Sequence, residues 1–112
     1  MLFEGEWYSF FHSFTLPTDN PFWTFRHYHV GVYTFEPRPP FRVLRWTPHP
    51  ILSARDEAPR AANLPHVIFP SGAFVEGDRW GVSAGVNDSE CRILHIPVKE
   101  IESRLRPYRP PL

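Results

Sequence analysis

Fourteen prolines are spread through a chain of 112 residues, and they restrict its backbone more than any other feature of the sequence. Proline has no amide hydrogen to donate and fixes its own φ angle, so a proline inside a helix breaks the helical hydrogen bonds. The sequence therefore excludes a helical bundle. The length allows one domain of ordinary size. Hydrophobic residues make up 42% of the chain, so we expect a folded core.

The charge balance restricts the class of partner. Twelve Lys and Arg residues offset twelve Asp and Glu residues, and a protein that neutralises nucleic-acid phosphates normally has a basic surplus. No apolar run is long enough to span a bilayer, and the N-terminal residues lack the pattern of a signal peptide. We therefore expect no nucleic-acid or membrane partner and a cytoplasmic location. The single cysteine, Cys91, excludes an internal disulfide.

Short segments rich in aromatic and β-branched residues lie between the prolines and predict strands. These segments are residues 6–14, 24–35, 41–46, 65–75, 79–86 and 91–96. Gly77 lies between two of them and tolerates positive φ, so Glu76, Gly77 and Asp78 predict a hairpin turn. Tight turns between successive strands favour antiparallel meander sheets.

One segment near the end has helical periodicity. Val98, Ile101 and Leu105 are spaced to share one helix face, and Pro97 lies at the first turn. We therefore predict a single all-β domain with one short C-terminal helix. Its parts are a first sheet over about residues 6–46, a second sheet over 64–97, a helix over 98–105 and an irregular tail over 106–112. Residues 16–22 and 53–64 are expected to be loops.

Two histidines form the first candidate site. His27 and His29 are two residues apart and share one face of a predicted strand, where a metal ion can reach both. A cupin-like barrel uses such a pair with a nearby carboxylate, but the next carboxylate, Glu36, follows six residues later. One hypothesis is therefore a small stand-alone β-barrel that binds a metal or another ligand. The interpretation that we favour is a pair of half-buried histidines, each hydrogen-bonded to a neighbour.

A polar pair follows the glycine-containing strand near residue 86. Asn87 and Asp88 in a tight turn can project into a pocket, where a carboxylate accepts hydrogen bonds from sugar hydroxyls. Asn and Asp are also common in plain turns, because their side chains bond their own backbone. Judged on local sequence, the plain turn is favoured.

The segment that contains Ser71 and Gly72 is a candidate pocket wall. A glycine in a strand allows close approach of a ligand or of a neighbouring strand. A bulge between two strands explains the same glycine, and the local sequence favours that interpretation.

Several short motifs, read in order, resemble one enzyme family. They are residues 10–13 (Phe-Phe-His-Ser), 28–31 (Tyr-His-Val-Gly), 39–43 (Pro-Pro-Phe-Arg-Val), 50–52 (Pro-Ile-Leu), 67–73 (Val-Ile-Phe-Pro-Ser-Gly-Ala) and 85–88 (Gly-Val-Asn-Asp). Their order and spacing are similar to the C-terminal part of glycoside hydrolase family 130, the β-mannoside phosphorylases and related glycosidases. The resemblance extends from about Trp7 to Leu105. It implies about two blades of a five-bladed β-propeller.

The resemblance also implies roles for individual residues. His12 matches a family histidine that helps to bind phosphate, and Tyr28 matches a tyrosine near the same anion site. Asp88 matches an aspartate that lines the sugar pocket. Inorganic phosphate is then a possible co-substrate, a carbohydrate is the expected ligand, and no metal or organic cofactor is implied.

The family's general-acid aspartate and most of its basic phosphate-binding residues have no counterpart in this chain. Cleavage of a glycosidic bond needs a proton donor at the leaving oxygen, with phosphate or activated water on the other face. We therefore assign no catalytic residue and expect a partial or remnant propeller that binds sugar or phosphate and lacks catalysis by itself. Two blades leave apolar faces uncovered. This predicts self-association or pairing with the missing blades.

Overall fold

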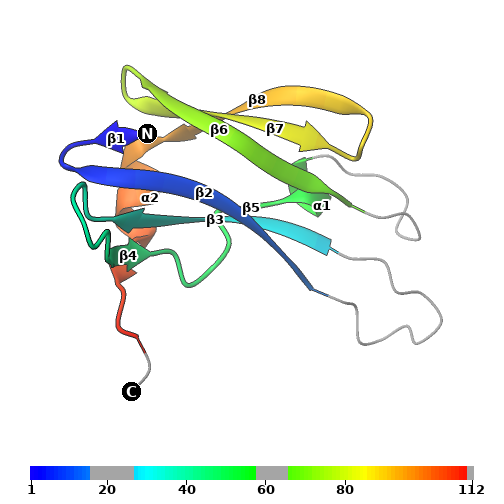
Figure 1. Cartoon of the computed structure of the whole chain (residues 1–112). Helices are drawn as coiled ribbons and strands as arrows, with labels where there is room; N and C mark the ends of the chain where they lie inside the picture. The colour runs from blue at the N-terminus through cyan, green and yellow to red at the C-terminus, as the bar shows by residue number, and fades with distance from the viewer. Residues whose placement is uncertain (16–26, 58–65, 111–112) are drawn as a thin grey trace.

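Two antiparallel sheets form the molecule, which we describe from a computed structural model over residues 1–15, 27–57 and 66–110 (Figure 1). The first sheet contains β1 (Leu2–Phe3), β2 (Glu6–Thr15), β3 (His27–Phe35), β4 (Val43–Trp46), β5 (Leu52–Ser53) and β9 (Arg106–Pro107). The second sheet contains β6 (Ile68–Glu76), β7 (Arg79–Val86) and β8 (Glu90–Pro97). The helices are α1 (Ala54–Glu57) and α2 (Val98–Arg104).

The hairpins are closed by residues that accept positive φ. Gly5 lies in the turn between β1 and β2 with φ of 86°, and Gly77 lies in the turn between β6 and β7 with φ of 64°. Asn87 and Asp88 connect β7 and β8 with φ of 52° and 55°. The connections at Gly5 and Gly77 are two residues long, a length that matches the right-handed twist of the paired strands, whereas residues 87–89 form a three-residue connection. The hairpin turn predicted at Gly77 is confirmed.

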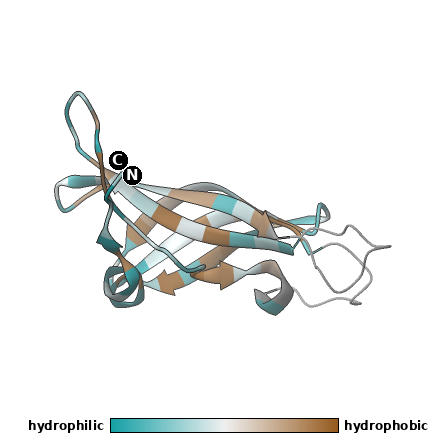
Figure 2. Cartoon of the chain, turned by 90° about the horizontal axis from the view of Figure 1, so that it is seen from below, coloured by the Kyte–Doolittle hydropathy of each residue, from teal (hydrophilic) through white to brown (hydrophobic). Residues whose placement is uncertain are grey.

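The core lies between the sheets, because alternate residues of each strand point to it. Val30 and Val32 of β3 belong to the same core cluster as Trp80 and Val82 of β7, and all four side chains are buried. In Figure 2, apolar positions recur along the strands between polar or neutral ones. This period of two residues is that of a sheet with one buried face.

Trp80 is the central side chain of this core and has no exposed surface. Its ring centroid lies 5.0 Å from that of Tyr8, 5.3 Å from Phe10 and 5.5 Å from Phe3. Trp80 belongs to the second sheet and its three ring partners belong to the first. Trp80 therefore joins the sheets through ring contacts, which add to the hydrophobic burial.

A charged network fastens one end of the first sheet to α2. Arg45 Nη2 donates to Glu6 Oε2 at 2.6 Å, and Arg45 Nη1 donates to Glu102 Oε2 at 3.0 Å. The Tyr8 hydroxyl donates to Glu102 Oε1 at 2.5 Å and accepts from Arg45 Nη2 at 2.9 Å. Thr34 Oγ1 also donates to Glu6, at 2.8 Å. We call Glu6, Tyr8, Arg45 and Glu102 the charged network, which ties β2, β4 and α2 together.

Proton affinities within the charged network are shifted. Burial, followed by the hydrogen bond to Glu102, raises the pKa of the Tyr8 hydroxyl well above its usual value. Burial alone would lower the pKa of the Arg45 guanidinium, but hydrogen bonds to Glu6 and Glu102 outweigh burial and raise it. Both shifts favour a protonated Tyr8 and a charged Arg45.

The all-β class, the antiparallel strands and the C-terminal helix are confirmed. Ile101 and Leu105 are buried and Val98 packs beside them, as the helical spacing predicted. The cupin-like barrel is wrong: the described strands form two sheets that pack face to face, and neither sheet closes on itself. The helices of the described ranges, α1 and α2, lack the length and apolar character needed to cross a bilayer.

Two segments differ from the sequence-based expectation. Residues 106–107 of the expected tail form β9, which pairs with β4, and the Tyr108 amide donates to the Leu44 carbonyl at 2.9 Å. Ala54 begins the single turn of α1 inside an expected loop, because its methyl group is fully buried in the core. Residues 16–26 and 58–65, which include most of both expected loops, and residues 111–112 lie outside the described ranges.

We predict that Trp80→Ala lowers the free energy of unfolding by about 3–5 kcal/mol, because it removes a fully buried ring between the sheets. Urea unfolding followed by circular dichroism measures this. Trp46→Ala is the matched control, since Trp46 is partly exposed, and it should cost less than about 1 kcal/mol. Equal costs for the two variants would contradict the central role of Trp80.

We also predict that Tyr8 makes stability depend on alkaline pH. Because its pKa is raised on folding, the stabilisation is complete below the unfolded tyrosine pKa of about 10 and is lost as pH rises above it. Urea unfolding between about pH 8 and pH 11 should therefore show a steeper decline for the wild type than for Tyr8→Phe. The difference in slope is at most about 1.4 kcal/mol per pH unit. Parallel curves for the two proteins would rule out this linkage.

Candidate functional site

His12 and Tyr28 lie together on the inner face of the first sheet. His12 pairs with Val30 across the β2–β3 ladder, and Phe14 pairs with Tyr28, so all four side chains share one face. The rings of His12 and Tyr28 are 5.8 Å apart between centroids. Antiparallel register therefore brings together two residues that are sixteen positions apart in the sequence.

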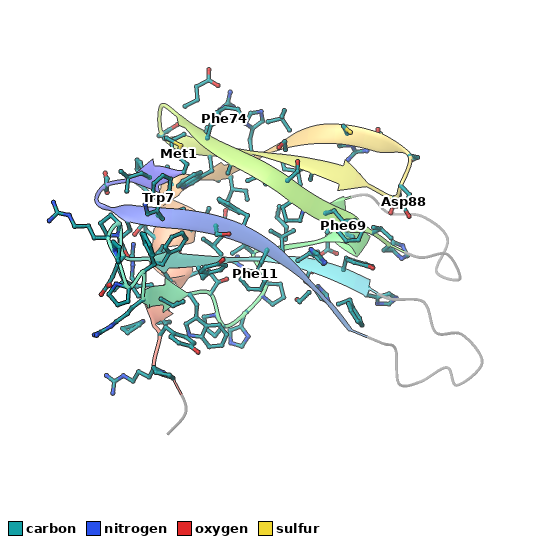
Figure 3. All side chains as sticks on the ribbon, in the orientation of Figure 1. Met1, Trp7, Phe11, Phe69, Phe74 and Asp88 are labelled. Atoms are coloured by element: carbon teal, nitrogen blue, oxygen red, sulfur yellow. The ribbon has the colours of Figure 1, made fainter. Side chains whose placement is uncertain are left out.

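Phe69 extends this group from the second sheet. Its ring centroid is 4.6 Å from that of His12 and 4.9 Å from that of Tyr28. Phe14 adds a fourth ring, 5.9 Å from Tyr28. We call His12, Phe14, Tyr28 and Phe69 the aromatic cluster. Figure 3 labels Phe69 near the start of β6.

The aromatic cluster is open to solvent. His12 is exposed, and Phe14 and Phe69 retain 46% and 38% of their accessible surface. Sequence reasoning did not assign Phe14 and Phe69 to the site. Strand parity could have indicated Phe14, because it lies two residues after His12 on the same face. Phe69 had no such signal, since its position depends on how the two sheets pack.

Asp88 lies in the turn between β7 and β8 and is exposed. Within the described residues, Asp88 forms no hydrogen bond or ion pair with His12 or Tyr28. Its neighbour Asn87 is fixed: the Asn87 amide donates to the Val67 carbonyl at 2.8 Å, and Asn87 Oδ1 accepts from the Val67 amide at 3.0 Å. These bonds place the turn beside the segment that leads into Phe69, so Asp88 lies at the same end of the second sheet as Phe69 (Figure 3).

Ser71 and Gly72 lie where β6 is interrupted by a bulge, because the register with β7 shifts between Pro70 and Gly72. The Ser71 hydroxyl is 3.0 Å from Ser83 Oγ and 3.2 Å from the Ser83 carbonyl. A cavity of about 220 Å³ lies between β2 and β6 at this bulge. Its lining residues are Met1, Tyr8, Ser9, Phe10, Pro70, Ser71, Gly72 and Ala73. The bulge that local sequence favoured is thus present, and it also borders a cavity.

His27 and His29 lie on the outer side of β3 and have protein neighbours. His29 Nδ1 is 2.9 Å from Ser53 Oγ, and the His27 ring lies 5.7 Å from the His66 ring. No group of three or more His, Cys, Asp or Glu side chains in the described ranges could hold a metal ion. The geometry is that of strand histidines in contact with neighbouring side chains.

The charged network is far from the aromatic cluster. Glu6 and His12 are six positions apart on one extended strand, roughly 20 Å at the usual rise per residue. Glu6 and Glu102 are both held by Arg45. Among the described residues, these two carboxylates therefore have a structural role and do not supply an acid at the cluster. The cluster offers ring faces, one imidazole and one phenol hydroxyl.

Ring faces beside an imidazole can contact a sugar or an oxyanion. Residues 4–106 match a family model described as beta-1,4-mannooligosaccharide phosphorylase, that of glycoside hydrolase family 130. No curated protein and no solved structure matches the chain. The matched range includes β2 to β8 and α2. The chain therefore belongs to glycoside hydrolase family 130.

Proposed function

We propose that the aromatic cluster is a carbohydrate-contacting surface related to that of the mannoside phosphorylases. The observation that supports this is the meeting of His12, Tyr28 and Phe69 from two sheets, with their rings partly open to solvent. Aromatic faces bind the apolar C–H faces of sugars, and an imidazole can bond a hydroxyl or an oxyanion. His12 and Tyr28 are also the positions that match the family motifs. The ligand class is a β-1,4-linked mannoside, with inorganic phosphate as co-substrate.

We further propose that the chain binds sugar or phosphate and does not cleave a glycosidic bond by itself. Cleavage needs a proton donor at the leaving oxygen. Within the described ranges, Glu6 and Glu102 form ion pairs with Arg45, and Asp88 forms no hydrogen bond or ion pair with His12 or Tyr28. In a complete site the proton donor comes from another part of the propeller.

The outer sheet faces support the proposal that these sheets are blades which pair with further sheets. Trp7 stacks on Phe35 with centroids 6.4 Å apart, and the Phe11 ring lies against Gly31, where an added Cβ would meet Phe11 Cζ at 2.5 Å. Partly exposed apolar side chains continue on both outer faces: Phe41, Trp46 and Tyr108 on the first sheet, and Phe74 and Ile93 on the second. Propeller blades bury such faces against their neighbours. The partner is a second copy of this chain or the complementary blades.

We predict that inorganic phosphate and β-1,4-mannobiose each raise the melting temperature of the wild-type protein. A ligand at ten times its Kd stabilises the folded state by about 1.4 kcal/mol, which is a shift of several degrees for a domain of this size. His12→Ala should reduce both the shift caused by phosphate and that caused by mannobiose. Differential scanning fluorimetry measures both.

His95→Ala is the matched control, because His95 is an exposed histidine on the outer face of the second sheet. It should leave both shifts unchanged. An absence of any response in the wild type at millimolar ligand, whether the protein is monomeric or associated, would sink the proposal. Equal responses of His12→Ala and the wild type would remove His12 from the site.

A further inference from the structure

A cationic pocket lies between the loop that follows β4 and the C-terminal end of α2. Its cavity has a volume of about 350 Å³. It is lined by Pro48, His49, Ser103, Arg104 and Arg106. None of these residues belongs to the aromatic cluster, which lies on the inner face of β2 and β3. The cationic pocket is therefore a separate candidate site.

Both guanidinium groups of the cationic pocket are held in place by backbone carbonyls. Arg104 Nη1 donates to the Pro50 carbonyl at 3.0 Å. Arg106 Nη1 donates to the Ser103 carbonyl at 2.8 Å and to the Leu105 carbonyl at 2.9 Å. The two bonds from Arg106 also satisfy carbonyls at the C-terminal end of α2. Without these bonds, the partial negative charge of those carbonyls would repel an anion. The side chains are therefore ordered before any ligand arrives, which lowers the entropic cost of binding.

The charge of the cationic pocket is not balanced by the described residues. Arg104 Nη2 forms an ion pair with Glu100 at 3.1 Å, whereas Arg106 forms no ion pair with a described carboxylate. Two guanidinium groups against one carboxylate leave one positive charge. The Nε and Nη2 atoms of Arg106 have no hydrogen-bond partner among the described residues. This edge of a guanidinium group is suited to binding two oxygens of one phosphate.

A second cavity adjoins the cationic pocket and gives it an apolar side. This cavity has a volume of about 240 Å³, shares Pro48 and His49 with the pocket, and is also lined by Phe11 and Trp46. A phosphate at Arg106 could therefore carry an organic ring that rests on Trp46 or Phe11. We propose that the cationic pocket binds a phosphate group, and that the adjoining cavity receives the organic part of a phosphate ester.

Nitrogen–proton correlation spectra of the wild-type chain test this proposal with three probes: inorganic phosphate, mannose 6-phosphate and mannose. Phosphate and the phosphate ester should shift the amide signals of the non-proline residues within 47–51 and 103–107, and mannose should not. Tighter binding of the ester than of inorganic phosphate supports the role of the adjoining cavity, and equal binding overturns that role. If neither phosphate probe shifts these signals, the proposal is overturned.

Variants assign the binding to the guanidinium group. Arg106→Gln should weaken phosphate binding by about tenfold or more, since it removes a charge-assisted hydrogen bond, and Arg106→Lys should restore part of it. Because Arg106 also caps α2, His49→Ala serves as a second variant that removes a lining donor and leaves the cap intact; it should weaken binding as well. Arg79→Gln removes an exposed cation at the β6–β7 turn and should change nothing. Wild-type affinity in both Arg106→Gln and His49→Ala overturns the proposal.

His12→Ala separates this site from the aromatic cluster. The phosphate-induced shifts at residues 47–51 and 103–107 should persist in His12→Ala, because the imidazole of His12 is not part of the cationic pocket. Loss of these shifts in His12→Ala would mean that they report the aromatic cluster, which would overturn a separate phosphate site.

Discussion

The packing of Trp80 against the first sheet is the contact on which the rest of the structure depends. Each sheet has an apolar inner face that must be covered, and the three strands of the second sheet would be marginal without it. Trp80 fills the space between Tyr8, Phe10 and Phe3, so the two sheets are fixed relative to each other. That fixed relation brings Phe69 of the second sheet against His12 and Tyr28 of the first.

Turns and helices that are formed by residues close together in the sequence could be predicted from the sequence. Gly77 indicated its hairpin turn, and the spacing of Val98, Ile101 and Leu105 indicated α2. The pairing of residues 106–107 with β4 could not be predicted, because these residues are short, contain a proline and join the sheet through distant partners. The helical turn that begins at Ala54 could not be predicted either. The burial of the Ala54 methyl group depends on residues that are distant in the sequence.

The same limit applies to the candidate site. Register between neighbouring strands places His12 beside Tyr28, so the family motifs and strand parity were enough to associate them. Phe69 required the packing of one sheet on the other. Asp88 also lies in a segment that resembles the family pattern, but it is exposed in its turn and forms no hydrogen bond or ion pair with the described residues His12 and Tyr28. The strand β2 thus has two distinct ends: the charged network lies near Glu6, and the aromatic cluster, which we propose as the carbohydrate-contacting surface, lies near His12.

Intermolecular nuclear Overhauser effects between β-1,4-mannobiose and aromatic side-chain protons test the central claim most directly. The packing described here predicts contacts from sugar C–H protons to the rings of Tyr28 and Phe69, which come from different sheets. Contacts confined to Phe11 and Trp46 on the outer face, with none to Tyr28 or Phe69, would contradict it.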